Sequence, residues 1–76
     1  MKTATDRQRA YLGLSYDQIC QLQGYHRNQA MALWQWAAPR FSSHGTDQKR
    51  YFDRYGAEAT YRRINRVRAW LGLEIV

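Results

Sequence analysis

The sequence predicts an all-α protein, a compact bundle of four or five short helices in a single domain spanning residues 1–76. Three observations predict this fold class. Hydrophobic residues make up 45% of the chain, which favours a folded protein over a disordered one. In several segments they recur three and four positions apart, which is helical spacing. Glycines, one proline and small polar residues separate these segments, and no internal repeat, low-complexity tract or domain linker is evident.

Two short helices are predicted before Gly24. The first covers residues 5 to 11 and ends near Gly13. The second begins with a capping box, in which the Ser15 hydroxyl accepts the backbone N–H of Gln18 and the Gln18 side chain accepts the backbone N–H of Ser15. The apolar side chains of this region are Ala10, Tyr11, Leu14, Ile19 and Leu22.

A third helix is predicted after Gly24, where the chain must turn and glycine reaches positive φ without steric cost. Pro39 disfavours helical geometry at Ala38, so this helix is expected to end there. The small residues Cys20 and Ala30 would let the two helices approach closely, in the layout of a helix-turn-helix. One buried face of the third helix is formed by Ala30, Leu33, Trp34 and Ala37.

This segment resembles the helix-turn-helix of bacterial sigma factors and of many transcriptional regulators, over roughly a quarter of the chain. It departs from the family pattern at Gln23, where an apolar residue is usual, and at Asp17, whose charge would repel a nearby phosphate. The resemblance is carried by Leu14, Ser15, Tyr16, Ile19, Gly24, Ala30 and Leu33. It implies that the residues after the turn face DNA, namely His26, Arg27, Asn28, Met31, Ala32 and Gln35.

Five of these six side chains, all except His26, have a matching base contact in the major groove. Arg27 suits the O6 and N7 of guanine, and Asn28 or Gln35 suits a bidentate contact with adenine. Met31 and Ala32 offer only apolar contact, for instance with a thymine methyl group.

The remainder of the chain predicts one or two helices around Gly56, where a stop or a kink is expected. Thr46 is the predicted cap, and Asp47 complements the helix dipole. From residue 57 to about 71 the helical spacing continues, and Gly72 suits a C-terminal cap. The predicted buried residues are Phe52 and Tyr55 before Gly56, and Ala57, Tyr61, Ile64, Val67 (or Arg68) and Leu71 after it.

The last helix has the densest positive charge, at Arg62, Arg63 and Arg66. Arg62 and Arg66 share a face, and Glu58 on the same side partly neutralises Arg62. One interpretation is a stripe that binds a second stretch of phosphates, and a sharper one makes this the helix that reads the groove. The third is an ordinary solvated face. The same surface would be extended by Lys49, Arg50 and Arg54.

The net charge of +6, with ten arginines and two lysines, favours nucleic acid as the partner, although an acidic protein is the alternative. No catalytic motif is present, and Cys20 and His26 lack the ligand spacing of a zinc site, so we expect neither an enzyme nor a bound metal or cofactor. The single cysteine excludes an internal disulfide and fits a reducing compartment. No apolar run approaches membrane-spanning length, and cytoplasmic residence is expected.

The sequence therefore predicts a small sequence-specific protein that binds double-stranded DNA, a transcriptional regulator of bacterial or phage type. The alternative is a phage-type adaptor or inhibitor that binds a host protein through the same scaffold. That alternative relies on Met31 and Ala32, on an exposed Trp36 and on the apolar tail at residues 71–76. Otherwise Trp36 would pack under the N-terminal helix or under the tail. Homodimer formation, common where two half-sites are read, stays open.

Overall fold

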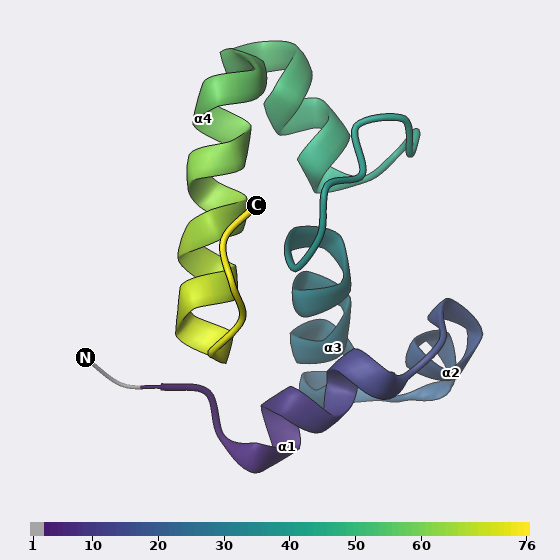
Figure 1. Cartoon of the computed structure of the whole chain (residues 1–76). Helices are drawn as coiled ribbons and strands as arrows, with labels where there is room; N and C mark the ends of the chain where they lie inside the picture. The colour runs from purple at the N-terminus through teal and green to yellow at the C-terminus, as the bar shows by residue number, and fades with distance from the viewer. Residues whose placement is uncertain (1–2) are drawn as a thin grey trace.

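The computed structural model describes residues 3–76, and within that range it contains helices and no strand (Figure 1). The all-α bundle is thus confirmed. The last element spans 25 residues, and the non-helical backbone of Gly56 divides it at a kink, as expected. The elements are α1 at Asp6–Ala10, a 3-10 turn at Tyr11–Gly13, α2 at Tyr16–Gln21, α3 at Gly24–Trp36 and α4 at Asp47–Leu71.

Most helix ends lie where the local sequence chemistry predicts, although α3 ends at Trp36, before the expected end at Ala38. The Ser15 hydroxyl accepts the N–H of Gln18 at 3.2 Å, and the Gln18 side chain accepts the N–H of Ser15 at 2.8 Å, which confirms the capping box. Thr5 forms a second capping box at the start of α1. Thr46 caps α4, and Gly72 ends it in a left-handed conformation.

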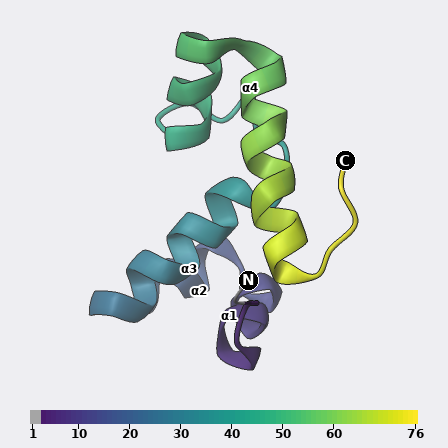
Figure 2. The same ribbon diagram turned by 90° about the vertical axis from the view of Figure 1, so that its left-hand side faces the viewer.

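In space, α3 occupies the middle of the molecule, between α1 and α2 at one end and the kinked α4 at the other (Figures 1 and 2). The segment after α4 returns along that helix. It is held by Asn65, whose side chain accepts the N–H of Val76 at 2.8 Å and donates to the Val76 carbonyl at 3.0 Å. The apolar tail therefore docks on the body of the same chain, although Ile75 stays 69% exposed.

The main core lies where α2, α3 and the end of α4 meet. Ile19 and Ala30 are each 1% exposed, as expected for the facing sides of α2 and α3. The core cluster comprises Ala4, Tyr11, Ile19, Ala30, Leu33, Ala37 and Leu71. Burying such a set of apolar side chains is the main favourable contribution to folding.

Four of the predicted core positions are wrong. Ala10, Tyr55, Ala57 and Tyr61 are all exposed, whereas Thr60, which the helical spacing passed over, is fully buried. For Ala57 and Tyr61 the reason is the register of the helix after Gly56, whose buried face runs through residues 60, 64, 67 and 71. The Thr60 hydroxyl donates to the Gly56 carbonyl at 2.7 Å, so this buried polar group has a hydrogen-bond partner.

Gly56 adopts φ 89° and ψ 175°, a combination open to glycine and strained for any other residue. A Cβ added there meets no atom within 4 Å, so only backbone strain opposes a side chain. We expect Gly56→Ala to lower the free energy of unfolding by about 1–2 kcal/mol, measured by urea denaturation. Gly13→Ala is the matched control because its added Cβ also meets open space and its φ is not positive. Equal stability of the two variants would contradict the prediction.

Candidate nucleic-acid interface

The segment around Gly24 folds as two helices with a connection of two residues. Leu22 and Gln23 are extended, and Gly24 then turns the chain at φ 56° into α3. Ile19 of α2 packs in the same core cluster as Ala30 and Leu33 of α3. The predicted turn and the close approach of the two helices are therefore both present.

The residues predicted to face DNA divide into two groups. Met31 and Gln35 are half-buried. The exposed residues are His26, Arg27, Asn28 and Ala32. Neither Arg27 nor Asn28 makes a side-chain hydrogen bond or ion pair with another residue of the range 3–76. α3 itself contains no Asp or Glu, whereas Asp17 in the first turn of the neighbouring α2 is exposed.

His26 has a structural partner that the sequence did not indicate. Its Nδ1 shares a hydrogen bond of 2.8 Å with the hydroxyl of Tyr11, a residue only 9% exposed. This contact ties the start of α3 to the 3-10 turn and orients the imidazole. A base or phosphate contact by His26 would therefore use its other ring nitrogen, Nε2.

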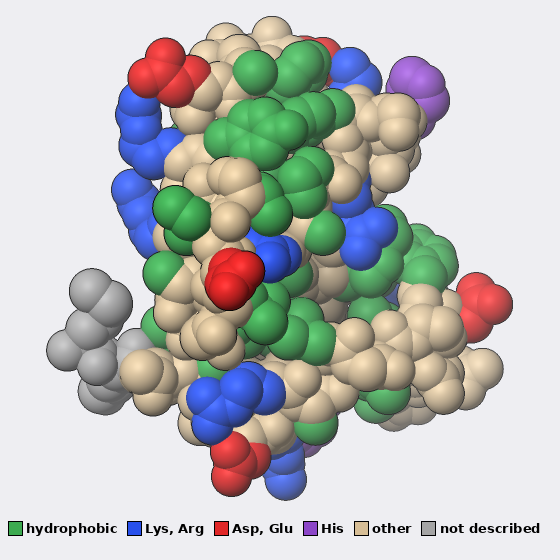
Figure 3. All heavy atoms as spheres, viewed as in Figure 1, with side chains coloured by type: hydrophobic (Ala, Val, Ile, Leu, Met, Phe, Trp, Pro, Cys, Tyr) green, Lys and Arg blue, Asp and Glu red, His purple; other side chains and the backbone are tan. Residues whose placement is uncertain are grey.

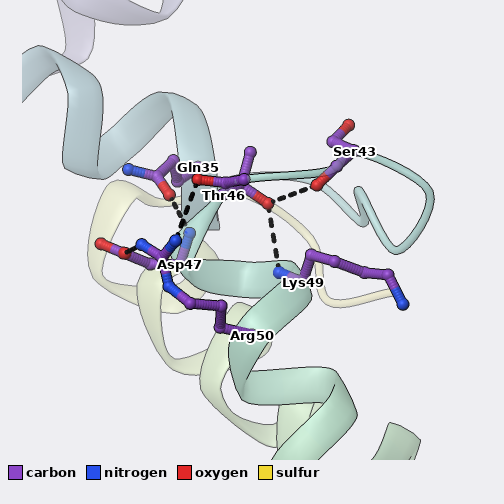
Figure 4. Close-up of polar contacts among 7 residues, drawn as sticks. Gln35, Ser43, Thr46, Asp47, Lys49 and Arg50 are labelled. Atoms are coloured by element: carbon purple, nitrogen blue, oxygen red, sulfur yellow. Dashed lines mark hydrogen bonds and ion pairs between the residues drawn. The ribbon is translucent and has the colours of Figure 1, made fainter.

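Gln35 also has a structural contact, at the junction with α4 (Figure 4). Its Oε1 accepts the backbone N–H of Asp47 at 2.5 Å, which satisfies one of the free donors at the start of that helix. In the same close-up, Thr46 donates to the Ser43 carbonyl at 2.8 Å and accepts the N–H of Lys49 at 3.1 Å. A bidentate adenine contact would need the Oε1 that Gln35 uses here.

A hollow of about 380 Å³ lies between α3 and the segment before α4, and Tyr16, Met31 and Trp34 contribute to its lining. Arg40 lies over the Trp34 ring, 4.1 Å from its centroid, and donates to the Trp34 carbonyl at 2.7 Å. Burial lowers the pKa of the Arg40 guanidinium. A hydrogen bond with Cys20 raises the pKa of Tyr16, whose ring is 4.9 Å from that of Trp34.

Trp36 is 6% exposed, so its proposed exposure is wrong. It packs against α4, rather than under the N-terminal helix or the tail, with its ring 5.5 Å from that of Tyr51 in an edge arrangement. The guanidinium carbon of Arg63 lies 4.2 Å from the Trp36 ring centroid and 5.1 Å from that of Tyr51. Stacking of this kind is favourable because the ring face is electron-rich.

The arginines predicted to bind phosphates are exposed on α4. Glu58 pairs with Arg62 at 3.2 Å, as expected, whereas Arg63 and Arg66 have no carboxylate partner within residues 3–76. Figure 3 shows Lys and Arg side chains along the left-hand edge of the molecule, where α4 lies.

Within the part of the chain that is described, no helix is both long and apolar enough to cross a membrane. The same residues contain no group of three or more His, Cys, Asp or Glu side chains arranged to hold a metal ion. Comparisons with protein-family models, with curated proteins and with solved structures give no match to this chain.

Proposed function

We propose that this protein binds double-stranded DNA in a sequence-specific manner and acts as a small regulator of bacterial or phage type. One observation carries the proposal. The first turn of α3 exposes His26, Arg27 and Asn28 in succession, on a helix without carboxylates whose other side is buried in the core. An exposed helix of this kind, fixed by a second helix beside it, is the shape that enters a major groove.

The chemistry of the exposed positions matches the edges of base pairs. The guanidinium of Arg27 fits the two acceptors of guanine, and the amide of Asn28 fits the donor and acceptor of adenine. Ala32 lies one turn after Asn28 and would contact a thymine methyl group. Met31 is half-buried, and the Gln35 side chain accepts the N–H of Asp47 at the start of α4. Both residues would therefore contribute less to base recognition than Arg27 and Asn28.

The backbone at the start of α3 supports the same proposal. Thr5, Ser15 and Thr46 each cap a helix with a side-chain hydrogen bond, whereas Gln23, the N-cap of α3, makes none. The first N–H groups of α3 therefore have no side-chain acceptor from their cap. Such groups, together with the positive end of the helix dipole, favour a phosphate of the DNA backbone.

The test is selection from a randomised duplex DNA pool at near-physiological salt, followed by sequencing of the bound fraction. Nonspecific phosphate attraction weakens steeply with salt, so base readout is what enriches a motif under these conditions. We expect one enriched motif, and a palindromic motif would indicate a dimer. A folded protein that enriches no motif would contradict the proposal.

A second candidate function is a protein-binding adaptor or inhibitor with a host protein as partner. Its support is the exposure of two large aromatics near the start of α2 and α3, Tyr16 at 49% and Tyr25 at 67%. Aromatic side chains are common anchors at protein interfaces. The buried Trp36 no longer supports this candidate. If Tyr25→Ala abolishes binding of a protein partner while DNA binding is weak and nonspecific, the result would favour the adaptor or inhibitor over DNA readout.

A further inference from the structure

A second charged surface lies on α4, away from the first turn of α3. We call it the arginine face, and it consists of Arg50, Arg54, Arg62, Arg63 and Arg66 together with Tyr51 and Tyr55. These residues line two hollows of about 370 Å³ each, which share Tyr51 and Arg63. The kink at Gly56 turns the first half of α4, so that the arginines of both halves line neighbouring hollows.

Arg63 lies at the point that the two hollows share, and its position is defined by aromatic rings. Its guanidinium carbon is 4.2 Å from the Trp36 ring centroid and 5.1 Å from that of Tyr51. Trp36 is nearly buried and packs on Tyr51, so this support is part of the folded core. A guanidinium ordered by stacking loses less side-chain entropy when it binds an anion.

The donors of Arg63 have no acceptor elsewhere in residues 3–76. Other arginines near the core are satisfied, since Arg40 donates to the Trp34 carbonyl and Arg68 to the Ala37 carbonyl. Arg63 makes neither a hydrogen bond nor an ion pair with the described residues. It therefore presents an ordered and unpaired fork of donors to solvent, the geometry that suits a phosphate group.

The surrounding charge favours an anion of extended shape. Asp47 pairs with Arg50 and Glu58 with Arg62, which leaves Arg54, Arg63 and Arg66 without a carboxylate partner in the described chain. These three arginines come from both halves of α4, so they suit a row of phosphates better than a single small anion. In Figure 2 the first half of α4 and the start of α3 project to the same side of the second half of α4.

We propose that the arginine face binds the phosphodiester backbone of the same duplex whose groove α3 enters, with Arg63 as its central contact. The choice of duplex DNA rests on the proposed function. The contact is independent of sequence, because phosphates are the same at every base step. It would supply affinity and orientation, while α3 supplies sequence preference.

The test measures the salt dependence of binding to a mixed-sequence duplex of about two helical turns, by fluorescence anisotropy. For Arg63→Gln we expect the slope of log affinity against log salt to become shallower by about one, and the affinity at about 0.1 M salt to fall roughly tenfold. Arg7→Gln, which removes the same charge from an exposed position of α1, is the matched control. Equal slopes for the two variants would overturn the proposal.

Arg63 covers Trp36, so Arg63→Gln also removes a packing contact of the core. A second variant, at Arg66, separates the loss of DNA binding from a loss of stability. Arg66 lines one hollow and makes no ion pair in the described chain, so Arg66→Gln leaves the core contacts intact. We expect a shallower slope there as well. Tighter binding of a single strand of the same length, abolished by Tyr55→Ala, would overturn the assignment to duplex. The selection experiment tests base readout by α3 and uses neither of these variants. The proposed function and the proposed role of the arginine face can therefore fail independently.

Discussion

Replacement of Gln48 with methionine is expected to lower the free energy of unfolding by about 2–4 kcal/mol. Gln48 is fully buried between α4 and the end of α3. Its Nε2 donates to the carbonyls of Gln35 and Ala38, and its Oε1 accepts the N–H of Arg40. Methionine has a similar length and makes none of these hydrogen bonds. Three backbone groups would therefore lose their partner, and each hydrogen bond has a net contribution of about 0.5–1.5 kcal/mol to stability.

The measurement is urea denaturation followed by the fluorescence of the tryptophans. Gln21→Met, on the exposed surface of α2, makes the same chemical change without a buried hydrogen bond and is expected to stay within about 0.5 kcal/mol of the parent. If Gln48→Met unfolds at the same denaturant concentration as Gln21→Met, then Gln48 does not hold the two helices together.

Local features of the fold could be predicted from the sequence. The Ser15 capping box, the cap at Thr46 and the turn at Gly24 all appear where expected. Each depends on residues within four positions of one another, so the chemistry of a short segment is enough to specify it. The kink at Gly56 belongs to the same class, because glycine alone readily adopts that backbone conformation.

Features that depend on distant residues could not be predicted in this way. From its position in the sequence, Gln48 would be expected on the polar surface of a helix. It is buried because its side chain donates to carbonyls ten and thirteen positions earlier in the chain. The same holds for Gln35, whose amide caps a helix twelve residues later. A signal was present at Trp36, because a large aromatic outside the expected face requires some cover. That cover comes from Tyr51 and Arg63, which the sequence does not place beside it.

The arginine face illustrates the same division. Charge patterning identified the dense arginines of the last helix, and the i, i+4 pair of Glu58 and Arg62 formed as expected. The pattern does not distinguish Arg63 from Arg62 or Arg66. What separates Arg63 is the tertiary packing of Trp36 beneath it, together with the absence of an acceptor in the described chain.

Replacement of Arg27 with alanine is expected to relax the sequence preference at one position of the bound motif and to weaken binding there by about 1–3 kcal/mol. Arg27 is exposed in the first turn of α3 and makes no ion pair within residues 3–76, so its removal disturbs no core contact. A guanidinium that binds the O6 and N7 of guanine contributes to the preferred sequence and much less to others. The selection experiment, repeated with this variant, measures the loss at each motif position.

The contrast between two arginines makes this prediction specific. Arg66→Ala removes the same charge from the arginine face, and we expect it to weaken all duplexes about equally, with the motif unchanged. Arg27→Ala should instead reduce the difference in affinity between the preferred DNA site and a site with one base pair substituted. If Arg27→Ala leaves binding unchanged, or weakens every sequence to the same extent, then α3 does not read bases through this residue. A motif that responds to Arg62 or Arg66 instead would assign base readout to α4, the alternative that the charge pattern raised.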